Sequence, residues 1–316
     1  MITLPAGTLL GPYETRDEWL AARKQGIGGS DIGTILGLST FSSALEVFYE
    51  KTGIGEGREV NEAMEIGAAI EPWIIQRYGD TAVWAKERYE IVDDLYIIQS
   101  NDHPWLLHSP DALLLDGIDS LPCAGIEIKN IRSDQHWDPL PPFYMAQVQH
   151  GLLCSGLERW IVVALVGGQK LITREIEPDK ELQGRIIVEG EWFWTSHVLA
   201  NVPPEPDGSE SASDALNRRW DASHGNVEVD PSLFIQLRAA DREVKAAERH
   251  YAKIQQVIKS KMGDSEVALT PDGERVATWK VSTRTSVDTK RLKEEEPKIA
   301  EKFSRTTPTR IFRPNL

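Results

Sequence analysis

Apolar residues in the N-terminal part of the chain recur at the three- and four-residue spacing of amphipathic helices. This spacing predicts helices over 16–23, with Trp19 and Leu20 facing inward, and over 44–51 and 61–78. In the last of these the repeat runs through Ala63, Ile66, Ile70, Trp73 and Ile74. From residue 89 the pattern changes to short β-rich runs separated by turns. We expect strands over 89–99, 106–115, 125–131, 159–166 and 171–177, and helices over 142–154 and 184–200. The succession predicts an α/β fold with a mixed central β-sheet flanked by helices.

A polar segment interrupts this pattern after residue 202. It carries three prolines followed by a serine-rich acidic run, a composition typical of a linker. Beyond it, 231–262 is predicted to form a long helix, and the turn Thr270-Pro271-Asp272-Gly273 joins 266–269 to 275–281 as a hairpin. We therefore expect a core over 1–203, a linker over 204–216 and a C-terminal helix–hairpin extension over 217–316.

Charge is distributed unevenly along the chain. The net charge of −14 argues against a general nucleic-acid coat protein. Residues 236–316 nevertheless hold 18 Lys and Arg against 12 Asp and Glu, whereas 1–235 hold 17 against 37. An acidic body with a basic tail fits DNA chemistry if some of the acids bind metals, and it fits an acidic enzyme with a charged terminal helix equally well. The tail is interpreted as a DNA-guiding arm, a subunit contact, a docking surface or a solvated appendage.

Several classes of protein are excluded or disfavoured by what the 316 residues lack. The N-terminus has no basic segment followed by an apolar run, and no apolar stretch approaches the length of a membrane span. Cys123 and Cys154 form no Cys-x-x-Cys pair, which excludes a four-cysteine zinc or iron–sulfur site within one chain. The nucleotide-binding pattern Gly-x-x-x-x-Gly-Lys-Ser/Thr is missing as well. A cytoplasmic protein is expected.

The strongest candidate chemistry is an acidic pair followed by a lysine. Asp111 follows Ser109-Pro110, and Glu127 and Lys129 share one face of a strand while Ile128 faces the other way. The dipeptide Asp116-Gly117 indicates a hairpin that brings the two acids together. Two carboxylates this close favour a cation between them, and hard oxygen ligands suit Mg²⁺ or Mn²⁺. Acids at such a spacing also occur as surface residues of ordinary hairpins.

A glycine-rich turn offers a second candidate. The sequence Gly26-Ile27-Gly28-Gly29-Ser30-Asp31 is expected to enter a helix capped by Ser30 or Asp31. Free backbone N–H groups at such a turn bind anions, including phosphate. A plain helix cap explains the same residues.

Taken together, these segments resemble the phage lambda-type alkaline exonucleases, also called YqaJ-like viral recombinases, of the PD-(D/E)XK nuclease superfamily. The resemblance covers roughly 16–200 and rests on several motifs in the expected order. They are Arg23 with Gly26–Asp31, Ile35–Ser39, Glu50–Gly53, Ala63–Gly67 with Ile70-Glu71-Pro72, Ser109-Pro110-Asp111, Glu127-Ile128-Lys129, and Tyr144–Gln149.

The resemblance implies a role for each matching residue. Asp111 and Glu127, with the backbone carbonyl of Ile128, would hold the catalytic Mg²⁺, for which Mn²⁺ could substitute. Glu71 would support a second metal or its water shell. Lys129 would position the attacking water and Gln147 would complete the site. Arg23 and Ser30 would bind the phosphate at the DNA end.

The resemblance also implies the reaction and its setting. The fold would be a restriction-endonuclease-like core. The enzyme would be a deoxyribonuclease that digests linear double-stranded DNA from 5′ to 3′ and leaves 3′ single strands for phage-type recombination. A single-strand annealing protein, a homotrimer, and a phage or prophage gene in a bacterial cell are part of this expectation. The alternatives are a related endonuclease or RecB-type nuclease, or a non-catalytic adaptor that binds DNA ends or the annealing protein.

Some residues permit a plainer interpretation. Glu71-Pro72 could simply end a helix. Gln147 and Gln149 lie about 200° apart on a helix, so at most one should reach the site and the other should be solvated. His103 and His108, which lack a partner at zinc spacing, are expected to be structural or at the rim. Trp137, in a polar loop, could stack on a base.

Overall fold

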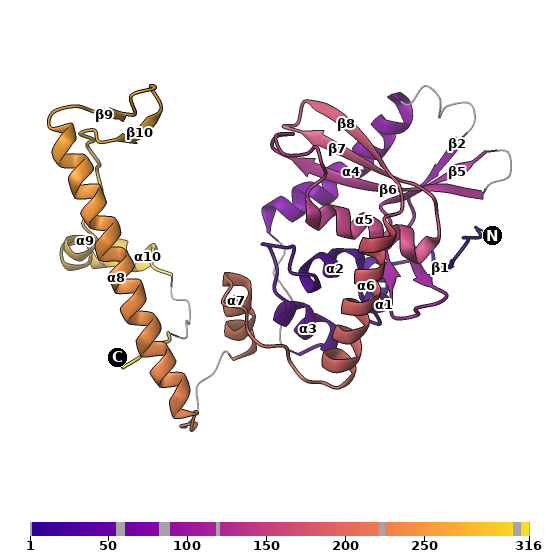
Figure 1. The fold of residues 1–316 in the computed structure, drawn as a ribbon, viewed down its shortest axis with the longest axis horizontal. Helices are drawn as coiled ribbons and strands as arrows, with labels where there is room; N and C mark the ends of the chain where they lie inside the picture. The colour runs from indigo at the N-terminus through magenta and orange to yellow at the C-terminus, as the bar shows by residue number, and fades with distance from the viewer. Residues whose placement is uncertain are drawn as a thin grey trace. The chain divides into compact units, whose positions relative to one another are not determined.

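The computed structural model describes residues 2–54, 61–81, 89–117, 121–220, 225–305 and 311–315. The chain divides into two compact units, Met1–Trp220 and Asp221–Leu316. Figure 1 shows the elements of both units along the chain. The candidate chemistry lies in the first unit.

A five-stranded sheet forms the centre of the first unit (Figure 1). Its strands, in spatial order, are β2 (Tyr89–Val92), β5 (Ala112–Asp116), β6 (Leu121–Ile131), β7 (Trp160–Val166) and β8 (Lys170–Ile176). The pair β6 and β7 is parallel, and the other neighbours are antiparallel. The predicted mixed sheet is confirmed.

Helices cover both faces of this sheet because its strands alternate apolar side chains between two cores. On one face, α4 (Glu62–Thr81) packs Ile74, Ile75 and Tyr78 against residues of β5, β6 and β7. The other face carries α5 (Pro142–Ser155), which also contacts α2 (Gly29–Ile35) and α6 (Lys180–Phe193). A π-helical turn, Trp194–Leu199, continues α6 and contacts α3 (Ala44–Thr52). The predicted flanking helices are thus confirmed.

Two predicted strands are each divided between two sheets. The run 89–99 forms β2 and then β3 (Ile97–Ser100), and the run 106–115 forms β4 (Leu107–His108) and then β5. Strands β3 and β4 join β1 (Gly7–Leu10) in a separate three-stranded antiparallel sheet. Pro110, which cannot donate a backbone hydrogen bond, lies at the break between β4 and β5.

Some residues expected to face the core are exposed. In α1 (Arg16–Arg23), Leu20 is exposed, and the helix is instead attached through Trp19, whose indole N–H donates to the carbonyl of Tyr96 at 3.4 Å. In α4, Ile74 of the apolar repeat is buried, whereas Ile66 and Trp73 of the same repeat are exposed. The inward orientation predicted for Leu20 was therefore wrong.

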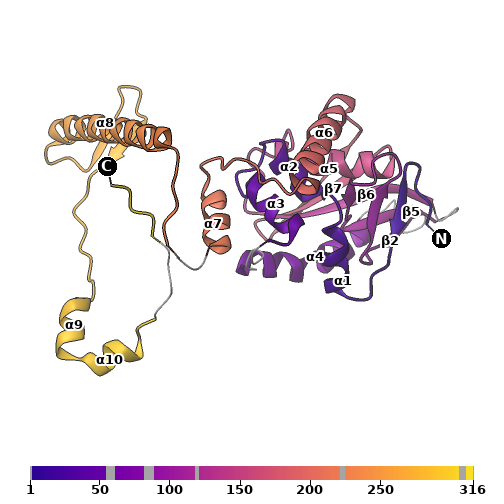
Figure 2. The same ribbon diagram turned by 90° about the horizontal axis from the view of Figure 1, so that it is seen from below.

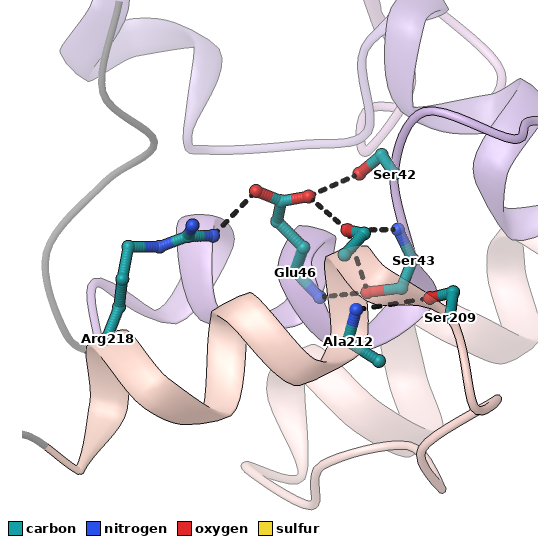
Figure 3. A network of polar contacts seen from close by, with 7 residues as sticks. Ser42, Ser43, Glu46, Ser209, Ala212 and Arg218 are labelled. Atoms are coloured by element: carbon teal, nitrogen blue, oxygen red, sulfur yellow. Dashed lines mark hydrogen bonds and ion pairs between the residues drawn. The ribbon is translucent and has the colours of Figure 1, made fainter. Parts of the chain in front are cut away.

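The segment expected to be an unpacked linker contains a docked helix, α7 (Glu210–Arg219). It buries Ala212 and Ala215 and packs on α3. Glu46 of α3 accepts hydrogen bonds from Ser211 at 2.5 Å and from Arg218 at 2.7 Å (Figure 3). The polar residues that suggested a linker instead form these contacts. The boundary between the two units falls after Trp220 rather than within 204–216.

The second unit is built on α8 (Pro231–Met262), whose bounds match the predicted helix. The predicted hairpin is formed by β9 (Val267–Leu269) and β10 (Arg275–Thr278), and β9 contacts α8. Figure 2 shows two short helices, α9 (Thr289–Glu295) and α10 (Pro297–Lys302), after the hairpin. Among the described residues, no helix of either unit has the length and apolar character needed to span a membrane.

Candidate active site

The β5–β6 hairpin brings the two predicted acids together. Antiparallel pairing places Ala112 opposite Ile126, so Asp111 lies just before the paired segment. The backbone N–H of Asp111 donates to the carbonyl of Ile126 at 3.2 Å. In return the backbone N–H of Ile128 donates to Asp111 Oδ2 at 2.6 Å. The carboxylate of Asp111 is therefore held beside the strand that carries Glu127.

Glu127 is buried and has two donors on one of its oxygens. Its Oε1 accepts hydrogen bonds from the ammonium of Lys129 and, at 2.6 Å, from Nε2 of Gln147 on α5. Its Oε2 has no hydrogen-bond partner within the part of the chain that the structure describes. The ammonium of Lys129 also lies 5.1 Å from the ring centre of Tyr144. One buried carboxylate oxygen thus retains free lone pairs.

Burial dominates the electrostatics of this site. Together with the charge of Asp111, it raises the pKa of Glu127 to about 8, although Lys129 opposes the rise. Burial also raises the pKa of Asp111, against the effects of Lys129 and of the Ile128 N–H. For Lys129 burial lowers the pKa, but the charges of Glu127 and Asp111 outweigh it and the pKa is raised. A cation bound beside these two buried acids would therefore be stabilised by their negative charge.

Glu71 approaches the same site from α4. Burial, followed by the charge of Asp111, raises its pKa to about 7, and Lys129 lowers it in part. The helix continues through Pro72 to Thr81, so the interpretation of Glu71-Pro72 as a helix end is wrong. The helix instead places Glu71 within electrostatic reach of the hairpin.

The glycine-rich turn joins Arg23 to Ser30. Gly28 is the N-cap of α2, and its N–H donates to Asp31 Oδ2 at 2.7 Å, so Ser30 does not cap the helix. The exposed Ser30 instead accepts a hydrogen bond from the guanidinium of Arg23 at 3.3 Å. Arg23 also lies 4.4 Å from the ring centre of Trp19, and its charge lowers the pKa of Asp111. The positive charge beside the turn therefore acts on the acidic pair.

Lys51 supports this turn, a role that the sequence analysis did not assign. The buried ammonium forms an ion pair with Asp31 at 2.6 Å and donates to the carbonyl of Arg23 at 3.2 Å. Its position on α3, in register with the buried Val47 and Phe48, was a visible signal, because a lysine on the apolar face of a helix needs a buried partner.

Three other predictions have clear outcomes. Gln149 is not solvated: it is buried, and its side chain bonds the carbonyl of Glu177 at 2.7 Å and the N–H of Asp179 at 2.8 Å. Trp137 is buried rather than available for base stacking. His108 is structural, as expected, and is packed in the core against His150. Their Nδ1 atoms lie 3.2 Å apart.

The ligands expected for a divalent metal are all oxygen atoms. In the described ranges, no three His, Cys, Asp or Glu side chains converge into a metal site. The expected ligand set requires only two carboxylates, Asp111 and Glu127, and the carbonyl of Ile128. These are hard oxygen donors, and one of them, Glu127 Oε2, is buried without a partner. The residues present therefore fit an oxygen-bound divalent ion.

Residues 18–158 match the family described as the YqaJ-like viral recombinase domain. This YqaJ-like domain includes both the turn and the carboxylate hairpin. The chain is also homologous to the uncharacterized protein YqaJ of Bacillus subtilis (strain 168), with 28% identity over 312 residues covering 94% of this chain and 93% of the relative. The matched family is the one that the motifs of the sequence resemble.

Solved structures similar to the chain include two of the alkaline exonuclease LHK-Exo from Laribacter hongkongensis, one of them a complex with dAMP. In both cases the sequence identity is 22%, and the match covers 59% of this chain and 94% of the solved chain, with a TM-score of 0.45.

Proposed function

We propose that the chain is a divalent-metal-dependent deoxyribonuclease that degrades linear double-stranded DNA from an end. The observation that carries this proposal is the convergence of Asp111, Glu127 and Lys129 across β5 and β6, within the YqaJ-like domain. A buried acidic pair with an adjacent ammonium stabilises little by itself, and perturbed carboxylates of this kind are typical of catalytic sites.

Asp111, Glu127 and the carbonyl of Ile128 would hold the metal, Mg²⁺ or Mn²⁺. When bound, such an ion polarises a phosphate oxygen and lowers the pKa of water. Glu71 would support a second ion or its water shell, since its carboxylate already responds to the charge of Asp111. Gln147 holds Glu127 by its Oε1 and so keeps the partnerless Oε2 in a fixed direction.

Lys129 would act on the attacking water and on the charge that develops on the phosphate. Its raised pKa keeps the ammonium protonated at neutral and alkaline pH, so it acts as a hydrogen-bond donor and cation. The ring of Tyr144, whose centre lies 5.1 Å from the ammonium, restricts the movement of this side chain.

Arg23 and Ser30 would bind the terminal phosphate of the DNA. A guanidinium and a hydroxyl already within hydrogen-bond distance of each other provide convergent donors to one phosphate. Lys51 fixes the backbone at Arg23, so this pair is prepared before DNA arrives. The proposal extends to 5′-to-3′ digestion that leaves 3′ strands for an annealing protein, to a homotrimer, and to a phage-type enzyme acting in the bacterial cytoplasm.

Metal-dependent cleavage tests this function. Linear duplex DNA should be degraded with Mg²⁺ or Mn²⁺ and remain intact with EDTA, and Asp111→Asn should remove the activity. Titration of Mn²⁺ into the wild-type chain should give saturable binding that is weakened in the same variant. Intact DNA under all metal conditions, with DNA ends still bound, would instead identify a non-catalytic adaptor.

A further inference from the structure

The long helix α8 carries a regular apolar stripe. Its apolar residues alternate at steps of four and three, which is the heptad spacing of helices that pair side by side. We call this stripe the seam; it consists of Leu233, Leu237, Ala240, Val244, Ala247, Tyr251, Ile254 and Ile258. All eight positions are apolar over more than three heptads.

Most of the seam is uncovered by the other described residues of the second unit. Leu237 and Ile258 are half-buried and the other six residues are exposed, with Val244 at 56% and Tyr251 at 67% of their full exposure. A helix with an apolar stripe of this length normally buries it against another element. Large contiguous apolar patches on a protein surface mark interaction sites.

Charges on α8 are sorted with respect to the seam. The positions that directly flank it between 234 and 257 include Asp241, Glu243 and Glu248, and none is Lys or Arg. The cations from 238 to 259 lie on the remaining face, at Arg238, Arg242, Lys245, Arg249, Lys253 and Lys259, and Lys261 occupies the next position of the repeat, where the apolar seam ends. Residues that flank a heptad seam determine which helix can pair with it.

These flanks disfavour a second copy of α8. A parallel pair would place Glu243 of one helix opposite Glu248 of the other. The antiparallel register with the greatest overlap would place Asp241 opposite Glu248. Both arrangements set like charges against each other beside the seam. A helix with basic flanks would meet attraction at the same positions.

We propose that the seam of α8 is a docking surface for an amphipathic helix of a partner protein, whose apolar stripe is flanked by Lys or Arg. Ala240 and Ala247 leave room in two layers, so the partner is expected to present bulky side chains there. The basic face of α8 remains outward in such a pair.

Two synthetic helices serve as probes for the full-length chain. Both carry Leu at every a and d position of about four heptads, one with Lys and the other with Glu at every e and g position. In fluorescence anisotropy, the Lys-flanked peptide should bind more tightly by about tenfold or more. Val244→Asp with Tyr251→Asp should remove its binding, whereas Arg242→Ala with Arg249→Ala, on the opposite face, should leave it unchanged.

A charge reversal keeps the seam and the helix intact. Glu243→Lys with Glu248→Lys should reverse the preference in favour of the Glu-flanked peptide; Asp241 is left unchanged because Lys245 already pairs with it at 2.8 Å. Equal binding of both peptides, binding of neither, or an unreversed preference overturns the proposal. Sedimentation showing that the wild-type chain self-associates through the seam, with the Val244→Asp and Tyr251→Asp variant monomeric, would identify a second copy as the occupant instead.

Discussion

The backbone N–H of Ile128 donates to the carboxylate of Asp111 at 2.6 Å. This bond fixes the residue before β5 to the strand that carries Glu127 and Lys129. The hairpin therefore holds two buried acids together, although burial and mutual repulsion raise the pKa of Glu127. A site supported in this way by its own backbone is organised before any ligand binds.

Lys129→Ala should abolish DNA cleavage while leaving DNA binding nearly intact. The ammonium of Lys129 forms an ion pair with Glu127. Removal of a donor that stabilises developing charge lowers the rate of cleavage by about a hundredfold or more. Single-turnover cleavage and filter binding measure the two effects. Lys170→Ala, at an exposed lysine paired with Asp134, is the matched control and should cut at the wild-type rate. Wild-type cleavage by the Lys129 variant would remove this residue from the mechanism.

Gln147→Ala should lower the cleavage rate, whereas Gln149→Ala should lower the stability of the fold. Gln147 bonds Glu127, so its loss should lower the cleavage rate with little change in stability. Gln149 bonds the backbone at the start of α6, so its loss should lower the free energy of unfolding by about 1–3 kcal/mol. Urea unfolding and cleavage rates measured on both variants compare the two roles. Equal losses of activity at unchanged stability would contradict the assignment.

The contrast between these two glutamines shows where the sequence was sufficient. Helical geometry correctly predicted that only one of them would reach Glu127. It did not predict that α5 is covered on a second side by α6, which is why Gln149 is buried rather than solvated. The Asp111–Glu127 hairpin was predictable because strand alternation and an Asp-Gly turn are local features.

Longer-range contacts were not predictable in the same way. The segment before Trp220 was too polar to suggest packing, yet α7 docks with only two buried alanines because Glu46, distant in sequence, accepts its polar contacts (Figure 3). The ion pair of Lys51 with Asp31 likewise joins two helices whose spatial relationship no local pattern contains. Such pairings depend on how elements meet rather than on how each forms.

Arg23→Ala should weaken the preference for DNA ends that carry a phosphate. Loss of a charge-assisted contact to phosphate should reduce the ratio of cleavage rates on phosphorylated and unphosphorylated 5′ ends by about tenfold. Lys24→Ala is the control, because the neighbouring Lys24 is exposed and is the C-cap of α1. The assignment of Arg23 to the phosphate fails if its variant retains the wild-type ratio.

The buried histidine pair should make the fold sensitive to acid. Burial lowers the pKa of His150 from 6.5 to about 4, and burial together with His150 lowers the pKa of His108 well below its ordinary value. Below pH 6.5 the two histidines become protonated in the unfolded chain but stay neutral in the folded chain. The free energy of unfolding therefore decreases as the pH falls from 6.5 toward 4. By pH 5 the loss from His150 alone is about 2 kcal/mol.

Urea unfolding at a series of pH values measures this loss. His150→Gln cannot take up the proton, so its free energy of unfolding should fall less steeply between pH 7 and pH 5, whatever its value at pH 7. Parallel slopes for the variant and the wild type would exclude His150 as the source of the acid sensitivity.

End-labelled DNA shows whether the YqaJ-like domain supports digestion of duplex DNA from an end. Linear duplexes labelled at the 5′ or the 3′ terminus, and a covalently closed circle, are incubated with the full-length chain and Mg²⁺. The 5′ label should be released first, a 3′ single strand should remain, and the circle should stay intact. Cutting of the circle, or early release of the 3′ label alone, would contradict digestion from the 5′ end.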